Sequence, residues 1–389
     1  MKPPVSLPRP LRSAGVLAFA LQLASATPAL AAVITVGPNE TVTRIADAAR
    51  LARDGDTVLI RAGTYRGEVA VWTQKSLTLR GIGGRPVLVA AGQAAENKAI
   101  WVIRGEQVSI DNIEFRGARV AAGHGAGIRF ERGRLAVRDC VFEDNEHGIL
   151  VANFEDMELS IHDSVFRQAA RGGPLPAHLL YVGRIARFTL EGSRFEQGHG
   201  GHLVKSRARV NDIRYNLIAD GAGGEASYEL EFPEGGDATV VGNVIAQGPA
   251  TGNPAVISYG AEHGRWPVNR LRLAHNTLIN DGPAQGPFLR AWFERLPADA
   301  RVISHNNLLV GPGGFVDDMP GEHRGNARLP AGALGADSAW RGPLLKLEPV
   351  APEDDPALTP RAEFRFPAGT RPIDTPLRWA PGAFQTPLP

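Results

Sequence analysis

The chain repeats a six-residue pattern of apolar and polar positions eight times between residues 110 and 308. In each copy the first and last positions are apolar, and the fourth carries a small or amide side chain in nearly every case. The copies end 23 to 33 residues apart, at Phe115, Phe142, Phe166, Phe195, Ile218, Ile245, Leu278 and Leu308. A period of this length is typical of a solenoid, because one repeat cannot bury its apolar face without a neighbour.

The fourth position of the pattern predicts a ladder of stacked side chains. Its occupants in chain order are Ile113, Cys140, Ser164, Ser193, Asn216, Asn243, Asn276 and Asn306. An amide at such a position donates to one coil and accepts from the next, which satisfies backbone groups buried in the turn. Asparagine also tolerates the left-handed backbone of tight turns. We therefore interpret these residues as scaffold and expect the single cysteine to be a small buried side chain without a disulfide partner.

A second series of short strands lies between the copies of the pattern. Its members are residues 99–104, 127–131, 148–152, 178–183, 202–206, 227–232, 255–260 and 288–293. Two or three short strands in each coil predict an all-β parallel β-helix. Longer inserts at 118–125, 168–177, 221–226 and 260–268 must project outward, where they would flank one row of strands.

The two ends of the solenoid differ from its coils. Helical spacing of apolar residues over 39–54 predicts one helix, with Thr41 or Thr43 as its N-cap and Gly55 as its stop. We expect this helix to cap the N-terminal end, because an open solenoid end exposes apolar edges. We expect the β-helix domain to span 32–311, and residues 312–389 to form an irregular C-terminal cap packed on the β-helix.

The first 31 residues predict a signal peptide. Three basic residues precede an apolar run that is too short to span a bilayer, and a small-residue cleavage site follows. Cleavage would leave 39 basic and 41 acidic residues, which argues against a nucleic-acid binder. We expect an exported, periplasmic or extracellular protein that has no membrane span and is a monomer.

The coil pattern, with the strand and glycine turn at 55–65, resembles the right-handed parallel β-helix of the pectin lyase-like superfamily over residues 33–311. That superfamily mostly handles acidic polysaccharides as lyases, hydrolases and epimerases, and it includes adhesins that are not enzymes. The resemblance implies the fold and a polysaccharide partner, whereas the activity must be argued from the site.

Residues 204–248 are similar to a segment of the chondroitinase B and alginate lyase family, in which Lys-Ser precedes an Asn-ladder coil. The family's proton-abstracting lysine corresponds to Lys205. The next strand of that family ends in Leu-Arg-His-Gly, whose arginine assists catalysis. Here the stretch reads Leu230-Glu231-Phe232-Pro233, so that arginine is missing.

Candidate site residues concentrate in four adjacent coils near the long inserts. The predicted catalytic residues are Lys205, His202, His178, Glu229, Glu231 and Tyr228, and the predicted substrate-binding residues are Tyr181, Arg184, Arg207, Tyr259 and Glu262. His178 and His202 begin consecutive strands and should stack about one strand spacing apart, roughly 4.8 Å. Side chains of a strand alternate between its two faces, so an inward Leu230 places Glu229 and Glu231 on the outer face. An inward Leu203 likewise turns Lys205 inward, unless a bulge or the end of the strand releases the lysine.

These residues suit β-elimination of a uronate-containing glycan. That reaction needs a base for the C5 proton, a cation for the carboxylate and a donor for the leaving oxygen. A C5-epimerase shares the proton abstraction, and a non-catalytic glycan-binding or envelope-structural β-helix needs none of these groups. Two carboxylates two residues apart also suit Ca²⁺, although nothing in the sequence requires a metal or another cofactor.

Overall fold

The computed structural model describes residues 1–2, 4, 31–282, 286–334, 347–374 and 378–386. Residues 31–389 form one compact unit. The predicted signal peptide lies almost entirely outside the described residues. Among the described residues, no helix has the length and apolar character needed to cross a bilayer.

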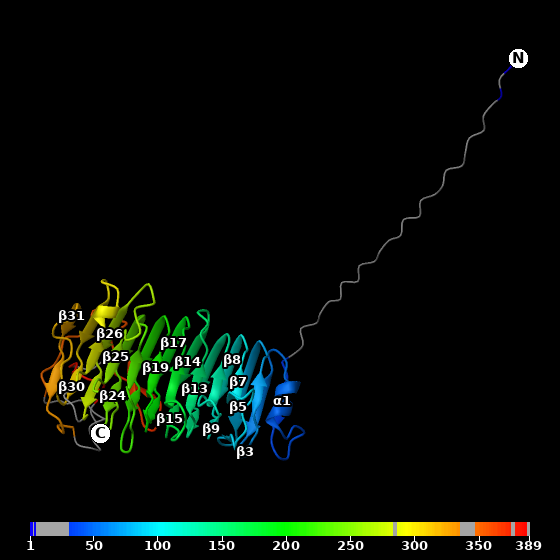
Figure 1. Ribbon diagram of the computed structural model, residues 1–389, viewed down its shortest axis with the longest axis horizontal. Helices are drawn as coiled ribbons and strands as arrows, with labels where there is room; N and C mark the ends of the chain where they lie inside the picture. The colour runs from blue at the N-terminus through cyan, green and yellow to red at the C-terminus, as the bar shows by residue number, and fades with distance from the viewer. Residues whose placement is uncertain (3, 5–30, 283–285, 335–346, 375–377, 387–389) are drawn as a thin grey trace. The chain divides into compact units, whose positions relative to one another are not determined.

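The chain folds as the predicted right-handed parallel β-helix, whose coils stack along the axis in Figure 1. Each full coil contributes a strand to sheets A, B and C in turn. Sheet A consists of β1 (Val33–Val36), β2 (Thr57–Arg61), β5 (Ser76–Ile82), β8 (Gln107–Asp111), β11 (Arg134–Arg138), β14 (Glu158–His162), β17 (Arg187–Glu191), β20 (Val210–Arg214), β23 (Asp237–Val241), β26 (Arg270–Ala274), β29 (Arg301–His305) and β31 (Gly321–Arg324).

Sheets B and C complete the three-sided solenoid. Sheet B consists of β3 (Thr64–Arg66), β6 (Val87–Val89), β9 (Glu114–Arg116), β12 (Val141–Glu143), β15 (Val165–Arg167), β18 (Arg194–Glu196), β21 (Leu217–Ala219), β24 (Val244–Gln247), β27 (Thr277–Asn280), β30 (Leu308–Val310) and β32 (Ala327–Leu329). Sheet C consists of β4 (Ala70–Trp72), β7 (Ala99–Ile103), β10 (Ala126–Phe130), β13 (His147–Val151), β16 (His178–Val182), β19 (Val204–Ser206), β22 (Leu230–Phe232), β25 (Ile257–Tyr259) and β28 (Leu289–Ala291). Sheet C is the predicted second strand series.

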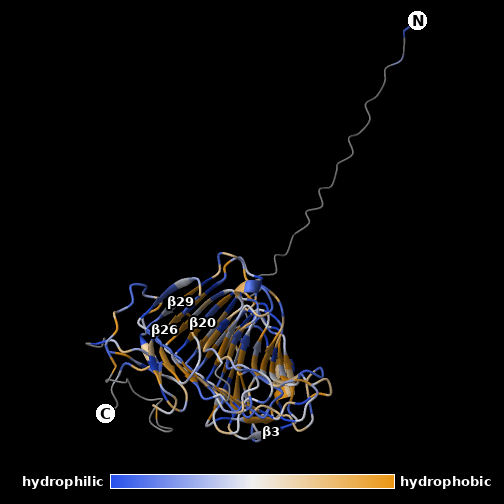
Figure 2. Cartoon of the chain, turned by 60° about the vertical axis from the view of Figure 1, so that its left-hand side comes forward, coloured by the Kyte–Doolittle hydropathy of each residue, from blue (hydrophilic) through white to orange (hydrophobic). Residues whose placement is uncertain are grey.

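The interior is filled by stacks of like side chains. The last residues of the first four copies of the pattern form one such stack, Phe115, Phe142, Phe166 and Phe195, with neighbouring ring centroids 4.5 to 5.2 Å apart. All four rings are buried. Offset aromatic stacks of this kind add to the stabilisation that burial provides. Figure 2 shows the apolar residues following the strands of the solenoid.

The asparagine ladder forms at the turn from sheet A to sheet B, with one correction. The Nδ2 groups of Asn216, Asn243 and Asn276 each donate to the next Oδ1, and the acceptor of Asn276 is Asn307, at 3.0 Å. Asn306 was predicted to occupy this last ladder position. It lies one residue before that position, and its backbone is left-handed, with a φ of +56°. Register pairs Leu278 with Leu309, so the sequence pattern placed the last copy one residue too early.

The ends of the solenoid are covered by short elements. The helix α1 (Ile45–Leu51) is shorter than predicted, and its N-cap is Arg44, which makes no side-chain capping bond. At the other end, β31 and β32 add a coil beyond residue 311. The C-terminal segment contains the antiparallel pair β33 (Ala362–Phe364) and β34 (Thr370–Pro372), and its Phe384 packs in a cluster with sheet B residues.

Candidate functional site

Four rings stand at equivalent positions of successive coils on sheet C. Register pairs His147 with His178, and His202 and Tyr228 continue the row. Ring centroids are 5.6 Å apart for His147 and His178, 4.8 Å for His178 and His202, and 5.2 Å for His202 and Tyr228. The predicted spacing of His178 and His202 is confirmed, although their rings meet edge to face, at an interplanar angle of 78°. Sequence reasoning missed His147, because the strand it begins is otherwise apolar.

A second row lies three residues further along the same strands. Register pairs Tyr181 with Lys205 and Lys205 with Glu231. Between the two rows, Leu203 and Val204 are both fully buried, so side chains do not alternate strictly at this point. The expectation that alternation turns Lys205 inward is therefore wrong, and the irregularity that could release it is present. Its side chain lies on the outer face, 12% exposed.

Glu231 joins the two rows. Its Oε2 lies 2.8 Å from Nε2 of His202 and 2.9 Å from Nζ of Lys205. Burial raises the pKa of the Glu231 carboxyl, but the adjacent imidazole and ammonium groups outweigh it and leave the pKa below its usual value. Glu231 is therefore an ionised bridge between a lysine and a histidine.

Glu262 approaches the same lysine from the insert at 260–268. Its Oε1 lies 3.5 Å from Nζ of Lys205. Arg207 donates to both of its oxygens, from Nε to Oε2 at 2.8 Å and from Nη2 to Oε1 at 2.6 Å. Burial raises the pKa of Glu262, and the hydrogen bonds and charge of Arg207 lower it further than burial raises it. The insert thus places a carboxylate across two cationic groups.

Arg207 also holds Tyr181. Its Nη1 donates to the phenol oxygen of Tyr181, and its guanidinium carbon lies 5.0 Å from the centre of that ring. Because the tyrosine oxygen accepts this bond, its own proton is free to be donated elsewhere. Burial lowers the pKa of Arg207, but its bonds to Glu262 and the nearby negative charges raise the pKa overall.

Arg184 and Arg207 share a second carboxylate, that of Glu234. Its Nε donates to both oxygens of the buried Glu234, at 2.7 and 2.8 Å. Nε of Arg207 lies 3.6 Å from the same carboxylate. Glu234, which sequence reasoning missed, therefore binds two arginines. Arg184 was predicted to bind substrate, but in this structure its guanidinium group binds the carboxylate of Glu234.

Two predicted site residues face the interior instead. Glu229 is fully buried, and neither of its carboxyl oxygens has a hydrogen-bond partner among the residues that the structure describes. The prediction that it faces outward with Glu231 is wrong, for the same loss of alternation that releases Lys205. Tyr259 is also fully buried, and its hydroxyl donates to the carbonyl of Gly236 at 2.6 Å. It is a core residue rather than a sugar-stacking one.

Two histidines of the ring row, His147 and His178, are held in neutral forms. The backbone N–H of His202 donates to Nδ1 of His178 at 2.9 Å, so the ring proton of His178 must lie on Nε2. Burial lowers the pKa of His178 well below its usual value and that of His147 to about 4. Burial likewise raises the pKa of the Tyr228 hydroxyl. His147, His178 and Tyr228 thus supply neutral polar groups beside the second row, which carries the charged side chains.

Together these residues form what we call the sheet C cluster: His147, His178, His202, Tyr228, Tyr181, Lys205, Glu231, Arg207 and Glu262. It combines paired cations, a hydroxyl donor and a carboxylate shared between lysine and histidine. Over the described ranges, no group of three or more histidine, cysteine, aspartate or glutamate side chains is arranged to hold a metal ion. The side chains present in the cluster are of the types that transfer protons and bind anions.

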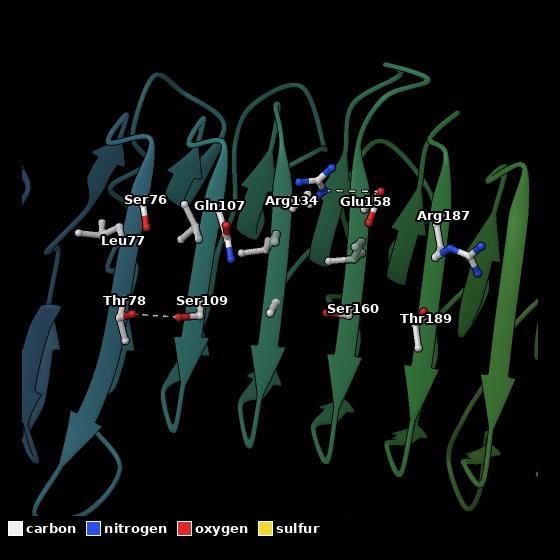
Figure 3. Close-up of a pocket in the computed structure, with 14 residues that line it drawn as sticks. Ser76, Leu77, Thr78, Gln107, Ser109, Arg134, Glu158, Ser160, Arg187 and Thr189 are labelled. Carbon is white, nitrogen blue, oxygen red and sulfur yellow. Dashed lines mark hydrogen bonds and ion pairs between the residues drawn. The ribbon is translucent and has the colours of Figure 1, made fainter. Parts of the chain in front are cut away.

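A separate shallow groove of about 270 Å³ lies on sheet A and is shown in Figure 3. Its middle is formed by small side chains, including Thr78 and Ser109, whose hydroxyls are 3.2 Å apart. Its upper rim in the figure includes Arg134 and Glu158, 3.6 Å apart. No histidine lines this groove, and it lacks the converging bases and donors of the sheet C cluster.

Comparison with known proteins shows a likeness of structure but none of sequence. No protein-family profile and no curated protein sequence matches the chain. Among solved structures, pectate lyase Pel9A aligns with a TM-score of 0.54 at 12% identity, over 91% of this chain and 96% of that one. A pectin methylesterase from Aspergillus niger aligns with a TM-score of 0.43 at 11% identity, over 75% of this chain and 86% of that one.

At such identities the likeness concerns the fold alone. The strand order and the alignment over nearly the whole length of both chains agree with the expectation drawn from the coil pattern. This protein has the right-handed parallel β-helix fold expected from its coil pattern, and its structure is similar to that of pectate lyase Pel9A.

Proposed function

We propose that this protein is a polysaccharide lyase that cleaves a uronate-containing glycan by β-elimination on the outer face of sheet C. The observation that carries the proposal is the convergence of Lys205, Arg207 and Tyr181 around shared carboxylates. β-Elimination needs a base, a cation for the uronate carboxylate and a proton donor for the leaving oxygen. The three side chains match these needs in type. Arg207 contacts Tyr181, and Arg207 and Lys205 both contact Glu262.

Each residue has a distinct role in the proposed reaction. Arg207 binds the uronate carboxylate, which makes the C5 proton more acidic by stabilising the negative charge that develops. The neutral amine of Lys205 takes that proton. Tyr181 donates its proton to the leaving glycosidic oxygen, and electrons from the C5–H bond form the C4–C5 double bond as the C4–O bond breaks. Lysine and tyrosine then exchange protons with water to return to their starting forms.

Lys205 must lose a proton before it acts as base. Glu231 provides the route, because its Oε2 lies between Nζ of Lys205 and Nε2 of His202.

The proposal includes export. Residues 1–31 have the composition of a signal peptide, and a lyase acting on a polymeric glycan must reach it outside the cytoplasm. The monomeric state is also a proposal, which size-exclusion chromatography tests. The sequence leaves the cofactor open, and activity after chelation tests whether Ca²⁺ takes part.

The test is an activity assay on the purified protein. Polygalacturonate, alginate, hyaluronan and chondroitin are each incubated with it between pH 6 and 9, and the ultraviolet absorbance of unsaturated uronates is followed. We expect one of these polymers to be cleaved, and Lys205→Ala to lower kcat/KM by about 10²- to 10⁴-fold.

Lys98→Ala is the matched control. Lys98 also pairs with two carboxylates, those of Glu96 and Glu131, just before a strand of sheet C. Its loss should leave kcat/KM within about twofold of the unchanged protein. The proposal is wrong if no acidic polymer yields unsaturated products, or if the two lysine variants behave alike. Exchange of solvent deuterium into C5 without chain cleavage would identify an epimerase.

A further inference from the structure

Glu262 occupies the place where the proposed function puts the uronate carboxylate. It contacts both cationic groups of the cluster, with two hydrogen bonds from Arg207 and an ion pair to Lys205. A guanidinium group holding both oxygens of a carboxylate is the geometry by which arginine recognises any carboxylate, whether of protein or sugar. Substrate and Glu262 therefore compete for the same donors.

The two carboxylates beside Arg207 differ in how easily they can be exchanged. Glu234 is 4% exposed and is held by two hydrogen bonds from the Nε of Arg184. Glu262 is 41% exposed and is bound only by Arg207 and Lys205 among the described residues. Removing Glu234 would leave two arginines without their buried partner, whereas Glu262 can turn into water at little cost. Of these two carboxylates, only Glu262 can separate from Arg207 at little cost in free energy.

The insert does not have to move when Glu262 leaves. Its backbone is held on both sides, by the N–H of Glu262 to the carbonyl of Pro233 at 2.6 Å and by the N–H of Gly264 to the carbonyl of Arg295 at 3.1 Å. Rotation of the side chain alone frees Arg207 and Lys205. Such rotations in exposed residues are fast compared with turnover.

We propose that Glu262 is a specificity-determining residue that stands in for a uronate carboxylate in the free protein and is displaced by the substrate. This inference rests on the proposed function and deepens it, because it replaces the predicted contact of Glu262 with substrate by a competition. A neutral sugar offers nothing to exchange for Glu262. A glycan that presents a carboxylate restores both hydrogen bonds, so the internal carboxylate favours acidic over neutral polymers.

The experiment measures binding as well as turnover. Glu262→Gln keeps the size of the side chain and removes its charge. The probes are acidic oligosaccharides of the four polymers named above and their carboxyl-reduced, neutral forms, with binding followed by calorimetry at low ionic strength. We expect Glu262→Gln to bind at least one acidic oligosaccharide about fivefold more tightly than the unchanged protein, which is the effect of losing one partly exposed ion pair.

The control is Glu155→Gln. Glu155 pairs with Arg265, is exposed, and makes no contact with Lys205 or Arg207 among the described residues, so its loss should leave affinity unchanged. The gain for Glu262→Gln should also be absent with the neutral oligosaccharides. The inference is overturned if Glu262→Gln binds every acidic probe equally or less tightly, or if Glu155→Gln produces the same gain.

Failure of this inference is distinguishable from failure of the proposed function. If no polymer is cleaved but Glu262→Gln still gains affinity for an acidic oligosaccharide, the competition stands and the lyase activity does not. If a polymer is cleaved and Glu262→Gln lowers kcat without lowering KM, the lyase stands and Glu262 takes part in catalysis rather than in competition. Thermal unfolding of both variants shows whether either change in binding reflects a loss of folded protein.

Discussion

At the scale of single residues, Glu229 conflicts with the interior in which it lies. It follows Leu179 and Leu203 at the same position of successive coils, yet it is fully buried, and within the described part of the chain both its oxygens lack a hydrogen-bond partner. Burial raises the pKa of its carboxyl well above the usual value, and the nearby Asp220 charge adds to the effect. The carboxyl group is therefore neutral in the folded protein at a pH where it is ionised in the unfolded chain.

This raised pKa predicts how stability changes with pH. The folded state retains a proton that the unfolded state loses above about pH 4.3, so the contribution of Glu229 is complete below that pH and decreases as pH rises. We expect Glu229→Leu, which matches the rest of its row, to raise the free energy of unfolding by about 1 to 3 kcal/mol at pH 8 and by less at pH 5. Urea unfolding measures both values. An equal gain at the two pH values, or a gain for the exposed Glu158→Gln, would contradict this account.

At the scale of elements, the ladder predicts a graded series of substitutions. Asn243 accepts two hydrogen bonds from Asn216 and donates to Ile213, Val241 and Asn276. Among the described residues, the hydroxyl of Ser164 makes two such bonds, accepting from Cys140 and donating to His162. We expect Asn243→Ala to lower the free energy of unfolding by about 3 kcal/mol and Ser164→Ala by about 1 kcal/mol. Equal losses, measured by urea unfolding, would show that the amides contribute no more than a hydroxyl does.

The same elements show how much of this protein can be predicted from its sequence. The coil pattern predicts nearly every strand. Each coil can bury its apolar side chains only against neighbouring coils, so apolar residues must recur at the same positions of every coil. It misplaces Asn306 by one residue, since two adjacent asparagines satisfy the pattern equally well and only the register distinguishes them. It cannot place Lys205 or Glu229, because their orientation depends on two consecutive buried residues rather than on alternation. The ion pairs of Glu262 and Glu234 join residues too distant in sequence for any local pattern to reveal.

At the scale of the whole molecule, buried neutral histidines lie on different sides of the solenoid. His147 and His178 lie on sheet C. His275 is fully buried beneath the C-terminal segment, where its Nδ1 lies 3.3 Å from the carbonyl of Ala380. Burial lowers the pKa of His147 and His275 to about 4 and that of His178 well below 6.5. Sites far apart in the structure thus oppose protonation for the same reason, the desolvation of a charged ring.

These histidines predict that the protein loses stability in mild acid. Between pH 6.5 and 4 the unfolded chain binds protons that the folded protein excludes, so the stability contributed by each depressed pKa is present above pH 6.5 and is lost as pH falls. Each histidine contributes at most about 1.4 kcal/mol per pH unit, and Glu229 opposes them with a slope of the other sign. Urea unfolding at half-unit steps from pH 7.5 to 4.5 should therefore show a falling free energy, and His275→Gln should reduce the slope by about one proton. His263 is exposed, so His263→Gln should keep the original slope. A free energy that stays level from pH 7 to 5, or a slope that responds equally to both substitutions, would mean that the buried rings accept protons by a local opening of the coils.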